Sequence, residues 1–117
     1  MDVKSSIERR CFSRFDCALP AEYRTIGFPN NDVLTGSIKN VSEGGTRLVT
    51  DNFIPLNSRL VLVFNFPFKN RKIKSLCKIV WTKRFATLAK YDLGVEFLDM
   101  TLKCRDDMAA FIRNKLS

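Results

Sequence analysis

Three arginines stand close together near the start of the chain, in the run Arg9-Arg10-Cys11-Phe12-Ser13-Arg14. Each guanidinium offers a planar fork of donors that matches phosphate oxygens or the O6 and N7 edge of guanine, and its flat face can stack on a base. Arg10 and Arg14 would lie about 13 Å apart in an extended segment and about 6 Å apart across one helical turn. Either spacing suits a bulky anionic ligand. The simpler alternative is a solvated basic arm that pairs with nearby carboxylates.

A second polar cluster follows about thirty residues later, in the run Asn40-Val41-Ser42-Glu43-Gly44-Gly45. Residues two apart on a strand project to the same face, so the Asn40 amide and the Ser42 hydroxyl could jointly meet a base edge or a ribose. Glycine at position 45 permits positive φ in a turn, and it lets a ligand or another strand approach the backbone closely. An ordinary turn is the simpler alternative, because turns select the same residue types.

Taken together and in this order, the two clusters resemble the PilZ domain family. The RxxxR motif of the family is matched by Arg10 and Arg14, and its [D/N]xSxxG motif is matched by Asn40, Ser42 and Gly45. The doubled arginine at positions 9 and 10 is also similar to many members. The run Asp92-Leu-Gly-Val-Glu-Phe97 resembles the final barrel strand of the family, so the resemblance covers nearly the whole chain.

The resemblance implies a receptor for the bacterial second messenger cyclic di-GMP, whose N-terminal loop folds over the ligand against a barrel and so signals to a partner. The pattern of the family assigns the contacts as follows: Arg10 and Arg14 are the principal ligand contacts, Arg9 is an auxiliary contact, Asn40 and Ser42 are polar contacts, and Gly45 permits the turn. Asn40 stands in place of the acidic alternative. Because a neutral amide oxygen is a weaker acceptor than a carboxylate, we expect somewhat weaker binding.

Hydrophobic patterning predicts a sheet that positions these clusters. In the segment 72–82, Ile73, Cys77, Ile79 and Trp81 share one parity and Lys72, Lys74 and Lys78 share the other, which is typical of a strand with one wet face. The same parity predicts that Trp81 is buried in the core, with a base-stacking role as the alternative. The β-rich runs are Leu19–Thr25, Val33–Val41, Thr46–Thr50, Arg59–Phe66, Ile73–Thr82 and Leu93–Leu98.

The end of the chain changes to helical spacing. Leu102, Met108, Phe111, Ile112 and Leu116 form an apolar stripe, with Thr101 as N-cap and Asp106 and Asp107 placed early to suit the helix dipole. We therefore predict an all-β fold, an antiparallel barrel of about six strands of the PilZ type, with a C-terminal α-helix that covers one end or flank. The expected limits are an arginine loop at 1–17, the barrel at 18–98 and the helix at 101–116 of a single domain, 1–117.

Composition excludes several classes of protein. The chain has 117 residues, about one domain, and no histidine, so no set of acid, base and nucleophile can be assembled and we do not expect an enzyme. The four cysteines form no CxxC pair, so we predict reduced thiols and neither a metal nor a cofactor. No apolar run matches a signal peptide or a bilayer span, which indicates a cytoplasmic protein without membrane insertion.

The net charge of +8 points to anionic partners. All of the surplus lies in the segment 52–91, which has nine Lys and Arg and no Asp or Glu, whereas the rest of the chain has eleven basic and twelve acidic residues. The ligand motifs therefore lie outside the basic segment. A solvated strand face explains this segment most simply, and a second surface that attracts the messenger or docks an acidic partner is the alternative.

The leading hypothesis is a non-enzymatic receptor for cyclic di-GMP, a monomer or weak dimer, which acts on a protein partner. Two alternatives remain open. A small basic β-barrel that binds nucleic acid would show steep salt dependence carried by lysines and indifferent to the arginine motif. A ligand-independent PilZ adaptor is the other alternative, and the two intact motifs argue against it.

Overall fold

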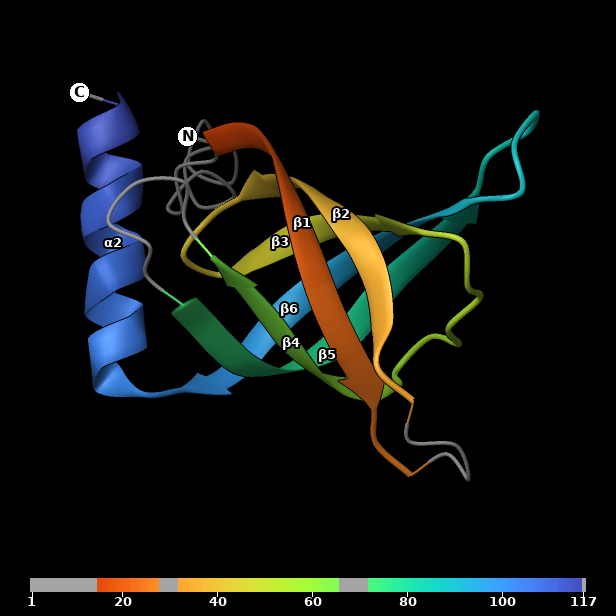
Figure 1. The fold of residues 1–117 in the computed structure, drawn as a ribbon, viewed down its shortest axis with the longest axis horizontal. Helices are drawn as coiled ribbons and strands as arrows, with labels where there is room; N and C mark the ends of the chain where they lie inside the picture. The colour runs from red at the N-terminus through yellow and green to blue at the C-terminus, as the bar shows by residue number, and fades with distance from the viewer. Residues whose placement is uncertain (1–14, 28–31, 66–71, 117) are drawn as a thin grey trace, which may run out of the picture.

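The computed structural model describes residues 15–27, 32–65 and 72–116. In this part of the chain six strands are followed by one helix (Figure 1). The strands are β1 (Phe15–Thr25), β2 (Leu34–Val41), β3 (Gly45–Thr50), β4 (Arg59–Asn65), β5 (Lys72–Arg84) and β6 (Tyr91–Met100), and the helix is α2 (Leu102–Leu116). All six predicted strands are present, and the expected all-β class with a C-terminal helix is confirmed. The start of the barrel differs, because β1 begins at Phe15 inside the segment expected to be loop.

The strands form a closed antiparallel barrel in the order β1-β2-β3-β6-β5-β4. Closure comes from the pairing of β1 with β4, in which Tyr23 lies opposite Leu62 and Thr25 opposite Leu60. Every strand therefore has a hydrogen-bonded neighbour on each side, and the described barrel has no open edge.

Alternation along the strands fills the barrel. Leu60, Leu62 and Phe64 of β4 are buried, while Val61 and Val63 between them are half-buried on the outer face. One buried polar contact joins distant strands, where the Tyr23 hydroxyl lies 2.7 Å from Thr50 Oγ1. A phenol buried this deeply needs a hydrogen-bond partner, and the Thr50 hydroxyl supplies it.

The pairing of β5 with β6 contains a register shift between Ile79 and Trp81. Ile79 is fully buried, as its parity predicts, but the Trp81 side chain is 43% exposed. A bulge inserts one residue and moves all following side chains to the opposite face. The prediction that Trp81 belongs to the core is therefore wrong, because parity was carried across a bulge that hydrophobicity alone does not reveal.

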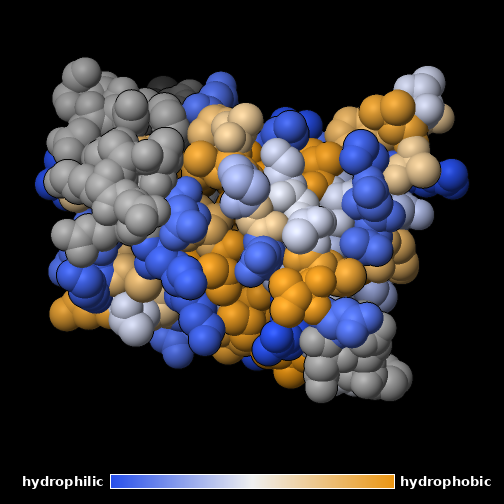
Figure 2. All heavy atoms as spheres, in the orientation of Figure 1, coloured by the Kyte–Doolittle hydropathy of each residue, from blue (hydrophilic) through white to orange (hydrophobic). Residues whose placement is uncertain are grey.

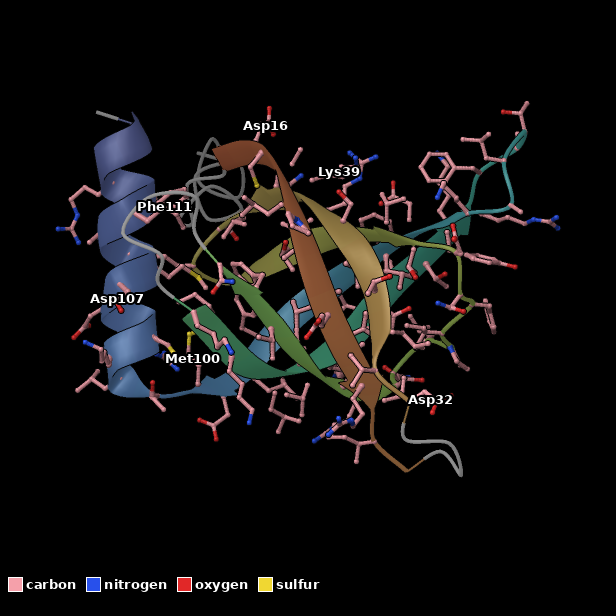
Figure 3. The ribbon with its side chains drawn as sticks, in the orientation of Figure 1. Asp16, Asp32, Lys39, Met100, Asp107 and Phe111 are labelled. Carbon is pink, nitrogen blue, oxygen red and sulfur yellow. The ribbon has the colours of Figure 1, made fainter. Side chains whose placement is uncertain are left out.

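Helix α2 lies at one end of the barrel (Figure 1). Thr101 caps it as predicted, because its Oγ1 accepts a hydrogen bond from the Cys104 amide at 3.1 Å. Met108, Phe111 and Ile112 are buried, and Phe111 lies on the side of the helix toward the barrel (Figure 3). The expected stripe is wrong at Leu102, which is 73% exposed.

The acidic residues of α2 do not lie where the dipole argument expected them. The first turn holds no acidic residue, since Asp106 and Asp107 come in the second turn. The side chain of Leu116 lies outside the described residues. No described helix is long and apolar enough to cross a membrane.

Candidate functional site

The turn between β2 and β3 is held by Ser42 and Gly45. The Ser42 amide donates to the Gly45 carbonyl at 2.9 Å. The Ser42 hydroxyl donates to the same carbonyl at 3.2 Å and accepts from the Gly45 amide at 3.2 Å. One hydroxyl can do both, because it carries one proton and two lone pairs. Ser42 therefore fixes the shape of the loop and keeps one acceptor lone pair available to a ligand.

Gly45 allows β3 to approach β6 closely. A Cβ atom at this position would lie 2.2 Å from the Val95 carbonyl oxygen, which is far inside van der Waals contact. The Phe97 amide donates to the adjacent Gly44 carbonyl at 3.0 Å and ties the loop to the same strand. Positive φ is not the reason for this glycine, since only Gly27 among the described glycines has it. Of the two roles expected for Gly45, the close approach of another strand is confirmed and positive φ is not.

Asn40 lies at the end of β2 and is 9% exposed. Its backbone carbonyl accepts a hydrogen bond from the Thr46 hydroxyl across the hairpin. The pairing of β2 with β3 shifts register between Ile38 and Asn40, so both Asn40 and the following Val41 are buried. The bulge therefore interrupts the alternation of β2 just before the loop.

Asn40, Ser42 and Gly45 line one hollow of about 560 Å³ on the outside of the barrel. A hollow of this size can take a ligand of nucleotide dimensions. Its wall also includes parts of the β2–β3 loop, β3, β5, β6 and α2: Glu43, Gly44, Thr46, Arg47, Val80, Trp81, Gly94, Val95, Glu96, Phe97 and Arg105. The hollow therefore lies where β3 pairs with β6 and β6 with β5.

Trp81 forms an aromatic wall of the hollow by packing on Gly94 across the β5–β6 pair. A Cβ atom on Gly94 would lie 2.0 Å from the indole Nε1, so only glycine leaves room for the ring. An aromatic side chain over a cross-strand glycine is a known way of covering exposed backbone in a sheet. The sequence favoured a core position for Trp81 and offered base stacking as the alternative, and the exposed ring fits the alternative.

Charges of both signs surround the hollow. Arg47 Nε donates to both carboxylate oxygens of Asp92, at 2.7 and 2.9 Å, and this hydrogen bonding raises the pKa of Arg47 above its usual value. Arg105 reaches the wall from the first turn of α2, and Glu43 and Glu96 are the acidic members. Because Asp92 neutralises the charge of Arg47, this pair contributes to the shape of the wall and little to its net charge.

The predicted contacts Arg9, Arg10 and Arg14, and Phe12 beside them, lie outside the described residues. The structure does give the point at which the chain enters the barrel. Phe15 lies opposite Val41 and Asp16 opposite Asn40 in the β1–β2 pair. The first described residues of β1 therefore adjoin the loop that lines the hollow.

Three of the four cysteines lie in the described residues. Cys17, Cys77 and Cys104 are free thiols, and Cys11 lies outside this part of the chain. Burial raises the pKa of Cys77 to about 12, and burial together with the Asp16 charge raises that of Cys17 to about 11. Both thiols are protonated at neutral pH and are weak nucleophiles.

Comparison with known proteins identifies one family and several similar folds. Among protein families, the PilZ domain matches residues 8–114. The structure of the Bacillus subtilis inhibitor of motility (MotI/DgrA) is similar with a TM-score of 0.78 and 15% identity, over 92% of this chain and 51% of that one. YcgR from Escherichia coli, solved in complex with c-di-GMP, has a TM-score of 0.74 and 14% identity over 91% of this chain and 45% of that one.

The PlzA protein of Borreliella burgdorferi, also solved in complex with c-di-GMP, has a TM-score of 0.59 and 14% identity over 98% of this chain and 56% of that one. The chain thus spans about half the length of these proteins, with 51% and 45% of the first two covered. A search of curated sequences finds no match. At these identities the structural likeness shows a shared fold.

Proposed function

Because the chain belongs to the PilZ domain family, we propose that it is a non-enzymatic receptor for cyclic di-GMP. The observation that carries the proposal is the hollow itself, where the complete [D/N]xSxxG loop meets an exposed tryptophan. Two similar structures, YcgR and PlzA, are described as complexes with c-di-GMP. In this proposal the residues 1–117 act as one PilZ domain.

The ligand offers groups that suit this wall. Cyclic di-GMP presents two phosphates and two guanines, and each guanine has a flat face and a polar edge. The Trp81 ring supplies a stacking surface, for which aromatic residues contribute about 1–3 kcal/mol per base. Asn40 and the remaining lone pair of Ser42 meet a guanine edge from the barrel side. Gly45 keeps the loop close to β6 and so keeps the hollow open.

Arg10 and Arg14 supply the principal contacts to phosphate and to guanine O6 and N7, and Arg9 assists. Support for this role comes from the place where the chain enters the barrel, because Asp16, two residues after Arg14, lies opposite Asn40. The arginine loop reorganises over the ligand and changes the surface that the protein presents to a partner. Such an order–disorder switch requires only that the ligand bind one arrangement of the loop better than the others.

Isothermal titration calorimetry with cyclic di-GMP tests the proposal. A hydrogen bond to a charged group contributes about 1.5–3 kcal/mol, so Arg10→Ala or Arg14→Ala should weaken binding about ten- to a hundredfold. The double variant should show no useful binding. The matched control, Arg59→Ala with Arg84→Ala, removes two arginines that do not line the hollow and should bind as the unmodified protein does. Absence of heat at high micromolar ligand would overturn the proposal.

A further inference from the structure

The outer face of β1, β4 and β5 carries a cationic surface separate from the hollow. Three half-buried aliphatic side chains, Val61, Val63 and Leu76, lie at its centre. Around them lie five basic residues, which with these three define the basic face: Arg24, Arg59, Lys72, Lys74 and Lys78. Figure 2 shows part of this side of the molecule, where hydrophobic atoms lie between hydrophilic residues over β1 and β4.

Strand pairing fixes the arrangement of the basic face. Successive rows place Arg59 opposite Lys78, Arg24 and Leu76 on either side of Val61, and Lys74 opposite Val63. Glu22, which also pairs with Val63, is the one carboxylate of these rows on β1, β4 and β5, and the rows end on β6 at Glu96 and Asp99. With strands about 4.8 Å apart and rows about 6.7 Å apart, the face extends roughly 10 Å by 20 Å between its outer positions.

The pairing of Arg59 with Lys78 works against folding, because like charges directly opposite each other in a sheet are destabilising. Within the described residues, no ion pair to Arg59, Lys74 or Lys78 is found, whereas Arg47 pairs with Asp92 and Lys90 with Asp51. On its other side Lys78 lies opposite Glu96 of β6, so a carboxylate offsets part of this repulsion. A solvated face has no need of the aliphatic centre formed by Val61, Val63 and Leu76.

We propose that the basic face docks an acidic amphipathic helix of a partner protein. The barrel is closed, so none of its described strands offers an edge to which a partner strand could add. The footprint matches one helix, which is about 10 Å wide and spans 20 Å in about 13 residues. An apolar centre with a charged rim is the anatomy of a protein interface, whereas nucleic acid is bound chiefly through cations and phosphates.

The proposal can be tested on the full chain without cyclic di-GMP, so its outcome is independent of the proposed ligand. The probe is a labelled synthetic helix of about 14 residues with leucines at i, i+3, i+4 and i+7 and glutamates on both flanks, followed by fluorescence anisotropy. We expect saturable binding that weakens with added salt, and no binding of the same peptide with Gln in place of Glu.

Lys74→Glu with Lys78→Glu should weaken peptide binding about tenfold. The same change at Lys83 and Arg84, which lie further along β5 outside the face, should leave it nearly unaltered although the net charge is equal. Equal losses in both double variants, no binding of the acidic peptide, or tighter binding of a labelled DNA duplex of about 14 base pairs would each overturn the proposal.

Discussion

The hollow beside the Asn40–Gly45 loop carries charges of both signs, whereas the basic face over β1, β4 and β5 carries five cations and has its carboxylates at the border, Glu22 on β1 and Glu96 and Asp99 on β6. In the hollow, Arg47 is already held by Asp92, and the wall is defined by two glycines that let strands and an indole come close. The basic face has no such close contacts. Net charge therefore locates the surface suited to long-range attraction, and the site suited to a compact ligand is found from shape.

Gly45→Ala should have the largest effect on the hollow. The new methyl group would meet the Val95 carbonyl, which is backbone and cannot rotate away, so β3 must shift from β6. We expect a loss of about 1–3 kcal/mol in the free energy of unfolding and loss of cyclic di-GMP binding, measured by thermal denaturation and calorimetry.

Gly36→Ala is the matched control for this change. A Cβ atom there would lie 2.9 Å from the Val49 carbonyl oxygen, but Gly36 does not line the hollow. It should lower stability and keep ligand affinity. Equal loss of affinity in both variants would mean that binding follows stability and that the shape of the hollow is not decisive.

Trp81→Ala should weaken cyclic di-GMP binding about five- to a hundredfold, because it removes a stacking surface worth about 1–3 kcal/mol. Trp81→Phe keeps a ring over Gly94 and should retain most of the affinity. Phe53→Ala removes another exposed aromatic side chain, at the β3–β4 connection, and should have no effect. Unchanged affinity in Trp81→Ala would exclude the indole from the ligand site.

Arg105→Ala should weaken binding about two- to fivefold, because this exposed guanidinium reaches the wall from α2 and water screens its charge. Lys103→Ala removes a cation from the same turn of the helix that does not line the hollow. Titration calorimetry should show no change for it. Equal weakening by both variants would indicate general attraction by charge.

Charge reversal of three lysines on the basic face should have the smallest effect on the affinity for cyclic di-GMP. With Lys72, Lys74 and Lys78 all changed to Glu, the affinity for cyclic di-GMP at physiological salt should change less than about twofold, because charges beyond a Debye length are screened. Calorimetry at two salt concentrations measures it. A large loss would show that the two regions act as one site.

Much of the barrel could be predicted because period-two alternation reflects burial directly. The strand with Ile73, Cys77 and Ile79 inward is an example, since each of these side chains is buried as its parity predicts. The first four residues of β1, 15–18, could not be predicted in this way. Asp16 and Ala18 have low strand propensity, and the pairing of Phe15 and Asp16 with β2 extends the strand despite it.

The sequence could predict only the part of the candidate site that one short segment, the Asn40–Gly45 loop, contributes. The order Asn40, Ser42, Gly45 marks the loop, but the wall opposite depends on Trp81, which the bulge after Ile79 turns outward. A bulge depends on tertiary pairing, so parity within β5 alone cannot reveal it. Gly94 held a clue, because a glycine within a predicted strand often marks a close approach.

The central claim is that cyclic di-GMP binds in the hollow beside Trp81, and one titration of the full chain tests it most directly. Trp81 is the only tryptophan, so intrinsic tryptophan fluorescence reports on this wall alone. Calorimetry and fluorescence should show saturable heat and a saturable fluorescence change with the same midpoint. Saturable heat with unchanged Trp81 fluorescence, or no heat at high micromolar ligand, would contradict the claim.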